Sequence, residues 1–123
     1  MSEISETNGL LGKTCEPCRG GVDPLTEPDL SKYLKMLNKE WEIIESKRLE
    51  RTFKFKDFAE ALVFANHVGQ LAEEQQHHPD IHLSWGKVKI ELWTHKIGGL
   101  HQNDFILASG IDRNQTPPVE LVV

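Results

Sequence analysis

The chain has 123 residues, of which 38% are hydrophobic and 27% charged, and its formal net charge at pH 7 is −5. These values are typical of one soluble globular domain. No apolar run approaches the roughly 18 residues of a membrane span, and Met1 to Asn8 lacks the basic and apolar segments of a secretory signal. The basic residues are interleaved with acidic ones, whereas nucleic acid binds a concentrated basic face. We therefore expect a cytoplasmic protein that binds neither membrane nor nucleic acid.

Residues 1–24 are predicted to form an N-terminal extension that is loop or disordered. The stretch 13–25 carries two prolines and a Gly-Gly pair, which favour loop structure. Cys15 and Cys18 form a C-x-x-C pair, which can be redox-active or half of a zinc site. No predicted strand precedes Cys15, and no other ligand pair stands at a compact zinc-finger distance. We therefore expect reduced thiols without a metal.

A short helix and a β-hairpin are predicted next. Thr26 and Asp29 have the spacing of a capping box, and a helical apolar face then continues to about Asn38. Residues 41–44 indicate a first strand and residues 49–55 a second, with the turn between them at residues 45–47. The apolar face of this helix consists of Leu30, Tyr33, Leu34 and Leu37. One face of the second strand carries Leu49, Arg51, Phe53 and Phe55.

A longer helix is predicted to begin after Asp57, which together with Glu60 gives a second N-cap signal. An apolar stripe then extends over more than four turns. Pro79 disfavours the α conformation at the residue before it, so this helix should end near His77 and His78. The stripe consists of Phe58, Ala61, Leu62, Ala65, Val68 and Ala72.

The remaining segments indicate a second hairpin and a third helix. Apolar and polar residues alternate from Ile81 to Trp85 and again from Lys87 to Trp93, with Gly86 at the turn and His95 closing the second strand. The third helix is predicted from 101 to 112, and residues 114–123 form a C-terminal tail. The domain therefore spans 25–113. We expect an α+β fold of order α-β-β-α-β-β-α, with a four-stranded antiparallel sheet and helices packed on one face.

Three histidines stand where predicted elements end. In an unbroken helix the adjacent His77 and His78 would diverge by about 100°, but at a broken helix end both can face one site. The helix C-terminus and Glu73 favour a protonated His77, which would make it a proton donor. His95 occupies a strand position that points away from the core and could accept a proton. The other interpretations are plain surface histidines, or a zinc hydrolase that uses the same three rings. Surface or structural roles are expected for His67, His82 and His101.

These residues give the chain a family resemblance. It resembles the pterin-4a-carbinolamine dehydratases, the family also known as dimerisation cofactor of a homeodomain transcription factor. The family pattern is matched at every spacing by Glu73, His77-His78-Pro79, Trp85, His95 and Asp104. Supporting matches are Phe53-x-Phe55-Lys56-Asp57-Phe58, Thr94-His95, Gly99-Leu100 and Leu107-Ala108-Ser109. The likeness covers about residues 25–112.

The resemblance implies the fold predicted above and a hydro-lyase activity. The expected enzyme is a 4a-hydroxytetrahydrobiopterin dehydratase, which removes water by acid/base chemistry to give quinonoid dihydropterin and so supports pterin cofactor recycling. It needs no metal and no redox cofactor. The implied catalytic residues are His77, His78 and His95, with Glu73 and Asp104 supporting them. The implied substrate-binding residues are His77, His78, Pro79, Trp85, Thr94, His95, Lys96 and Ile97.

The resemblance also implies self-association, because its members are homodimers or homotetramers. Unpaired strand edges invite pairing with a second copy. The outer face of the last strand carries too many charges for a dry contact between sheets, so we expect association through a strand edge or through helices. The alternative functions are a non-enzymatic dimerisation or scaffold protein and a molybdopterin-related accessory protein.

Overall fold

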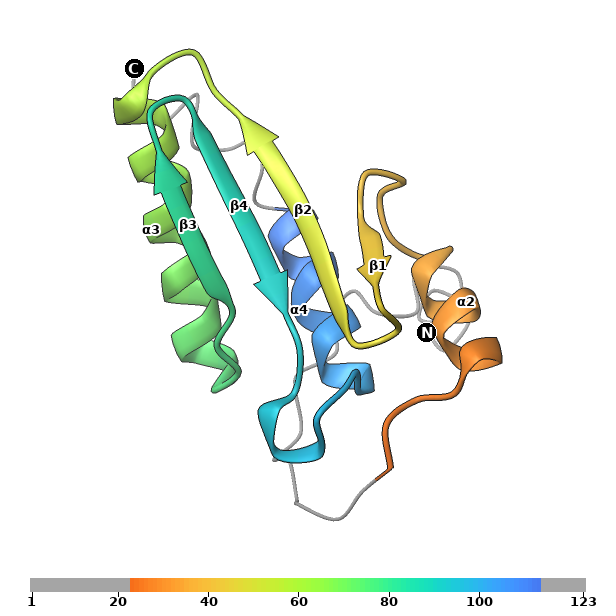
Figure 1. Ribbon diagram of the computed structural model, residues 1–123. Coiled ribbons are helices and arrows are strands. Elements are labelled where there is room, and N and C mark those ends of the chain that lie inside the picture. Colours follow the sequence, from red (N-terminus) through yellow and green to blue (C-terminus); the bar gives the residue numbers. More distant parts are fainter. Residues whose placement is uncertain (1–22, 114–123) are drawn as a thin grey trace, which may run out of the picture.

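The computed structural model describes residues 23–113, so Cys15, Cys18 and the tail at 114–123 lie outside the described residues. The elements follow the predicted α-β-β-α-β-β-α order, with a short 3₁₀ helix, η1, added before the last helix (Figure 1). Within the described range, no helix is both long and apolar enough to cross a membrane. In chain order the elements are α2 (Glu27–Leu34), β1 (Glu42–Ile44), β2 (Arg48–Lys54), α3 (Phe58–Gln75), β3 (Asp80–Ser84), β4 (Lys87–Leu92), η1 (His95–Ile97) and α4 (Gln102–Arg113).

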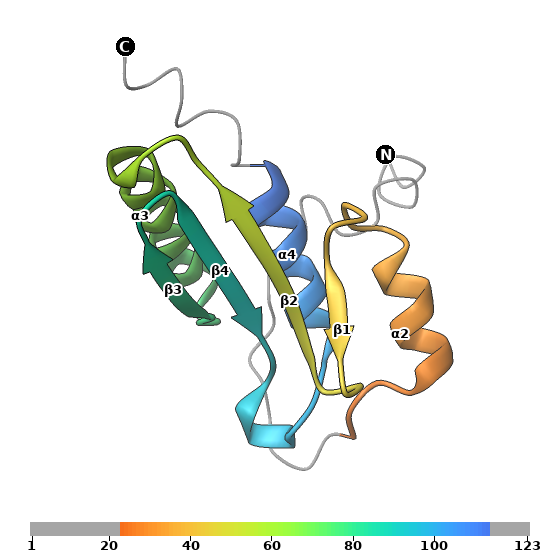
Figure 2. The same ribbon diagram turned by 45° about the horizontal axis from the view of Figure 1, so that its top comes forward.

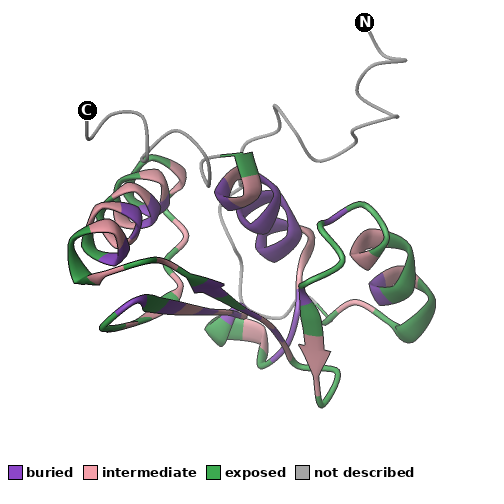
Figure 3. Cartoon of the chain, turned by 90° about the horizontal axis from the view of Figure 1, so that it is seen from above, coloured by how far each residue is buried: buried purple, intermediate pink, exposed green. Residues whose placement is uncertain are grey.

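The four strands form one antiparallel sheet in the order β1-β2-β4-β3. The two hairpins therefore join through β2 and β4, while β1 and β3 form the edges (Figure 2). The α-helices α2, α3 and α4 lie on the same side of this sheet (Figure 3). The predicted fold class, α+β with helices on one face, is confirmed.

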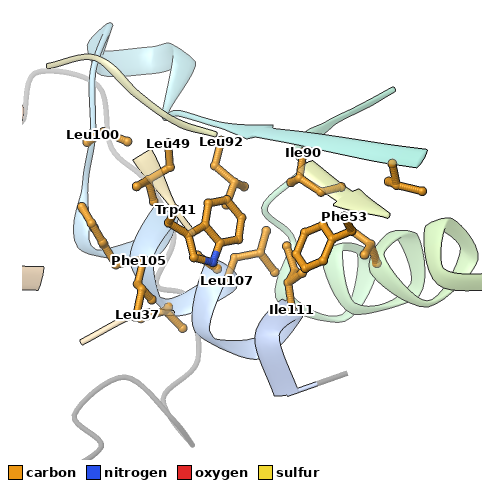
Figure 4. Close-up of a cluster of buried hydrophobic side chains, with 14 of the residues drawn as sticks. Leu37, Trp41, Leu49, Phe53, Ile90, Leu92, Leu100, Phe105, Leu107 and Ile111 are labelled. Atoms are coloured by element: carbon orange, nitrogen blue, oxygen red, sulfur yellow. The ribbon is translucent and has the colours of Figure 1, made fainter. Parts of the chain in front are cut away.

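The hydrophobic core fills the space between the sheet and the helices. The register places Leu49 opposite Leu92 and Phe53 opposite Val88, so their side chains share the helix-facing side. These side chains meet apolar groups from α4 and the loop before β1 (Figure 4). The rings of Phe53 and Phe64 are 4.6 Å apart between centroids. Each such side chain, fully buried, contributes about 1.5–3 kcal/mol to the stability of the fold.

Helix α3 starts as predicted, but its buried face matches the predicted stripe only in part. Ala61, Val68 and Ala72 are buried as expected. The side chain of Asp57 accepts a hydrogen bond from the backbone N–H of Glu60 at 2.9 Å, which confirms the N-cap. Phe64 is fully buried, whereas Phe58 and Leu62 are 43% and 40% exposed. The apolar residues cover more of the helix circumference than the sheet can contact, so the sheet selects one side of α3 and leaves Phe58 and Leu62 outside. The residues of α3 that are buried are Ala61, Phe64, Val68 and Ala72.

The capping box predicted at Thr26 is wrong. Thr26 is the N-cap of α2, but its side chain makes no cap hydrogen bond and its hydroxyl instead donates to the Asp29 carboxylate at 3.4 Å. Pro28 in the first turn has no amide hydrogen to offer a cap. The helix also ends earlier than predicted, at Leu34. Two i→i−3 backbone bonds then tighten the chain, and one of them, from Leu37 to Leu34, keeps Leu37 in the core.

An ion pair connects the inner face of the sheet to helix α4. Arg51 lies on the inner face of β2, and its Nη1 atom is 2.7 Å from Oδ1 of Asp112 in α4. The same oxygen accepts a hydrogen bond from Nε1 of Trp41 at 2.8 Å. Burial raises the pKa of Asp112 against the opposing effect of these donors. The pair links the last turn of α4 to the sheet.

Candidate active site

Three segments meet around the carboxylate of Asp104, which belongs to the first turn of α4 and is completely buried. One of its oxygens, Oδ2, accepts a hydrogen bond from the hydroxyl of Thr94 at 2.8 Å and from the backbone N–H of His101 at 2.9 Å. Its other oxygen, Oδ1, is 2.7 Å from Nε2 of His77. A carboxylate only accepts hydrogen bonds, so Nε2 of His77 is the donor. Three donors therefore offset the cost of burying this charge.

The end of α3 directs His77 inward. Gln76 adopts the left-handed conformation, with φ of 55°, and its N–H bonds to the carbonyl of Glu73. The N–H of His77 bonds back to the carbonyl of Ala72 at 3.2 Å. This pair of bonds is the Schellman motif, which reverses the chain at a helix C-terminus. The side chain of His77 is consequently only 10% exposed.

The structure corrects the predicted partner of Glu73. Its carboxylate lies 2.6 Å from Nε2 of His78, and not against His77. The reversal at Gln76 turns His77 towards α4, while His78 remains over the last turn of α3, where Glu73 projects. Both partners are open to solvent, with side chains 55% and 72% exposed for His78 and Glu73. The two adjacent histidines therefore have different surroundings, one buried and one exposed.

His95 does not close a strand as predicted. Strand β4 ends at Leu92, and His95 is the exposed first residue of η1. An isolated bridge between Thr94 and Gly99 closes this loop, with a backbone bond of 2.9 Å from Thr94 N–H to the Gly99 carbonyl. The tight 3₁₀ turn ends the ladder before His95. Its ring lies against that of Trp93, with centroids 4.4 Å apart.

The other predicted substrate-binding residues divide into two groups. Pro79 directly follows His78, and Lys96 and Ile97 share η1 with His95. Trp85 lies elsewhere, because it occupies the turn between β3 and β4 and is 72% exposed. Since β3 starts next to Pro79 and runs away from it, Trp85 stands at the opposite end of the hairpin (Figure 1). Within one chain, the fold does not bring Trp85 to the histidines.

The three candidate histidines also differ in their free ring nitrogens. His77 uses Nε2 on Asp104 and His78 uses Nε2 on Glu73. The ring of His95 makes no hydrogen bond with any described residue. Across residues 23–113, no three His, Cys, Asp or Glu side chains are grouped so that they could hold a metal ion. The arrangement is suited to proton transfer, with one oriented ring and two accessible ones.

Sequence reasoning missed the local role of His101. Its Nδ1 atom accepts a hydrogen bond from the backbone N–H of Asn103 at 3.1 Å, while Asp104 accepts one from the N–H of His101. These reciprocal bonds resemble a capping box, with an acidic residue three positions after the cap, although the cap side chain accepts from the second helical N–H instead of the third. That spacing was the signal that could have located the start of α4. The contact of Thr94 with Asp104 could have been inferred from parity, since Thr94 shares the strand face of Leu92.

The chain is similar in sequence to known proteins. The model of the pterin 4 alpha carbinolamine dehydratase family matches residues 23–114. A protein of Alkaliphilus metalliredigens (strain QYMF), provisionally named a pterin-4-alpha-carbinolamine dehydratase, is 50% identical over 109 residues, which cover 89% of this chain and 98% of that protein. A protein of Rubrobacter xylanophilus with the same provisional name is 47% identical over 113 residues, 92% of this chain and 99% of its own.

A crystal structure shows the same likeness in three dimensions. The transcriptional coactivator/pterin dehydratase from Brucella melitensis matches with a TM-score of 0.69 and 29% sequence identity. The match covers 74% of this chain and 97% of that protein. The chain therefore belongs to the pterin-4a-carbinolamine dehydratase family of hydro-lyases.

Proposed function

We propose that this protein is a 4a-hydroxytetrahydropterin dehydratase that serves in pterin cofactor recycling. It would remove water from the 4a-hydroxy compound, 4a-hydroxytetrahydrobiopterin being the expected form, and release quinonoid dihydropterin. The observation that supports this most is the bond between Nε2 of His77 and the buried Asp104, at 2.7 Å. It fixes one imidazole, while the rings of His78 and His95 are exposed to solvent. Family membership and this arrangement lead to the same chemistry.

The reaction needs two proton transfers. The bond from carbon 4a to oxygen breaks as the leaving oxygen receives a proton, and water departs. A proton leaves the neighbouring ring nitrogen, and the electron pair of that N–H bond forms the new double bond between this nitrogen and carbon 4a. Histidine can supply both transfers near neutral pH, and each well-placed acid or base contributes about 10²- to 10⁴-fold in rate.

We assign these transfers to His77, His78 and His95. Asp104 orients His77, and Glu73 orients His78, through the carboxylate bonds described above. Neither carboxylate needs to touch the substrate in this scheme. Contacts to the pterin are assigned to residues that adjoin the histidines in the chain, namely Pro79, Thr94, Lys96 and Ile97. Trp85, at the far end of the hairpin, is not part of the proposed site of a single chain.

The test is the rate of dehydration in single-histidine variants. His78→Ala and His95→Ala should each lower kcat/KM for the 4a-hydroxypterin at least about tenfold, as loss of an acid or base predicts. The rate is followed by stopped-flow, with circular dichroism to show that the fold survives. His82→Ala is the matched control, since His82 is an exposed histidine on β3 that pairs with Glu91. Wild-type rates in both active-site variants would refute the assignment.

We also infer a symmetric homo-oligomer, either a dimer or a tetramer. Phe58 and Leu62 lie one turn apart on α3, and both apolar side chains are exposed to water. The outer face of the sheet carries salt bridges instead, such as Lys89 with Glu50 and Glu91. Burial of apolar side chains drives most association, so these observations favour the α3 surface over the sheet face.

A further inference from the structure

His95 is the one candidate acid or base whose ring has no carboxylate partner among the described residues. His77 is bonded to Asp104 and His78 to Glu73. The ring of His95 instead contacts the indole of Trp93, with 4.4 Å between centroids and an angle of 43° between planes. Tilted and offset aromatic pairs at this separation are attractive. The contact with Trp93 is therefore what distinguishes His95 from an unconstrained surface side chain.

The backbone explains why the two rings meet. Thr94, between them, has φ of −98° and ψ of 105°, which is extended. In an extended segment, side chains two residues apart point to the same side. Thr94 points inward to Asp104 at 2.8 Å, so Trp93 and His95 both project to the other side. The contact follows from the sequence order Trp-Thr-His once Thr94 is fixed.

Of the two rings, the indole is the anchored one. Trp93 is partly buried and packs against the hydrophobic core, whereas His95 is exposed. The backbone of His95 is held by the bridge from Thr94 to Gly99. Only the side-chain torsions of His95 are left to be fixed, and an exposed histidine ordinarily samples several rotamers. The indole favours one of them by roughly 2- to 10-fold, the range of an aromatic pair.

We propose that Trp93 is a positioning residue that holds the imidazole of His95 towards the substrate. The inference rests on the proposed function, in which His95 transfers a proton. The indole covers part of one ring face and leaves both nitrogens at the ring edge free. A carboxylate partner would have occupied one of them, as Asp104 does on His77. Because rate depends steeply on alignment, loss of this contact lowers turnover without removing the reacting group.

Two variants of Trp93 test this role, with the exposed His82 as the control for activity. Trp93→Leu, which keeps an apolar side chain without a ring, should lower kcat about 3- to 10-fold with little change in KM. Trp93→Phe retains an aromatic ring and should restore most of the loss. His82→Ala removes an exposed ring on β3 that pairs with Glu91 and should leave kcat unchanged. Equal kcat in Trp93→Leu and the wild type would overturn the proposal.

A double-mutant cycle separates this role from simple loss of packing. If Trp93 acts through His95, Trp93→Leu should have no further effect in a His95→Ala background. If Trp93→Leu lowers kcat by the same factor in the wild type and in His95→Ala, the proposal is overturned, even where His95→Ala is itself strongly impaired. A wild-type rate in His95→Ala would instead refute the proton-transfer role of His95, the part of the proposed function on which the inference rests. The two failures are thus distinguishable.

A readout independent of activity is the proton NMR spectrum of His95. In the wild type, the ring protons of His95 should show an upfield ring-current shift and a nuclear Overhauser effect to the Trp93 indole. Trp93→Leu should remove the shift, and Trp85→Leu should preserve it. The wild-type measurement needs no variant to fold. Absence of the Overhauser effect in the wild-type protein would also overturn the proposal.

Discussion

Nε2 of His77 lies 2.7 Å from Oδ1 of Asp104, a carboxylate that has no exposed surface. The same carboxylate binds the Thr94 hydroxyl and the backbone N–H of His101. One buried charge therefore connects the end of α3, the loop after β4 and the start of α4. Its structural role and its effect on the histidine cannot be separated by deletion, so the first test uses the isosteric amide.

Asp104→Asn should lower kcat by about 10²-fold and the free energy of unfolding by roughly 2 kcal/mol. The amide carries one acceptor oxygen in place of two, so at least one donor loses a charge-assisted bond, worth about 1.5–3 kcal/mol. Stopped-flow dehydration and urea denaturation measure the two effects. Asp80→Asn is the control, because Asp80 is exposed at the start of β3. An unchanged kcat in Asp104→Asn would mean that the orientation of His77 has no catalytic importance.

Glu73→Gln should have a much smaller effect than Asp104→Asn. The pair of Glu73 with His78 is 2.6 Å long but more than half exposed on both sides. Exposed ion pairs contribute about 0–1 kcal/mol, because water screens them and their side chains lose entropy on pairing. We expect an unchanged melting temperature and a decrease in kcat of less than tenfold. A loss as large as that of Asp104→Asn would place Glu73 in direct contact with the chemistry.

Gly99→Ala should impair both stability and turnover, because Gly99 closes the loop that carries His95. A Cβ atom there would stand 2.8 Å from Cβ of Pro24, so either Pro24 or the loop closed by the Thr94 bridge must shift. Gly98→Ala is the matched comparison. Nothing lies within 4 Å of its added Cβ, but its φ of 65° makes alanine costly by about 1–2 kcal/mol. We expect lower kcat only in Gly99→Ala, measured together with thermal melting of both variants.

The sequence predicted the element order because each local signal agreed with the packing. The Asp57 cap, the break before Pro79 and the alternation from Val88 to Leu92 all correspond to observed features. The buried face of α3 was predicted only in part. Ala61, Val68 and Ala72 are buried as expected. The stripe omitted Phe64, because apolar residues occupy more of the helix than the sheet covers. Phe64 and Leu62 are equally hydrophobic in the sequence, and only the position of the sheet separates them.

The sequence pattern named the residues of the candidate site but did not give their contacts. The spacing placed His77, His78 and Asp104 in one pattern, yet it paired Glu73 with the wrong histidine. The Schellman reversal at Gln76 decides that pairing, and a glutamine in the left-handed conformation has no clear sequence signal. The contact of Trp93 with His95, in contrast, could have been predicted. It follows from strand parity and could have been inferred from two residues alone.

The outer face of the sheet should make stability depend on pH. A hydrogen bond from His82 at 3.0 Å, assisted by Glu50 and Lys89 and opposed by desolvation, holds the pKa of Glu91 below its usual 4.5. A carboxyl whose pKa falls on folding stabilises the protein above its unfolded-state pKa, and this contribution is lost as the pH falls through the folded-state value. The wild type should therefore exceed Glu91→Gln in free energy of unfolding by up to about 1 kcal/mol at pH 6.

The same comparison at pH 3 should show a smaller difference between the two proteins. Urea denaturation at both pH values measures it, and His82→Ala should reduce the difference at pH 6. A difference that is equal at both pH values, or larger at pH 3, would contradict the assigned direction.

The exposed apolar pair on α3 gives the test of assembly. Leu62 is 40% exposed and Phe58, one turn earlier, is 43% exposed, so a charge at Leu62 costs little in a monomer. In an interface the same charge would be buried without a partner, which is strongly unfavourable. We expect Leu62→Glu to reduce the mass measured by light scattering from a multiple of 14.0 kDa to that of one chain, with its melting curve still cooperative. Met36→Glu, at a residue 39% exposed just after α2, is the control and should remain oligomeric. A wild-type mass of a single chain at micromolar concentration would refute self-association, and an oligomeric Leu62→Glu would exclude this face of α3 as the interface.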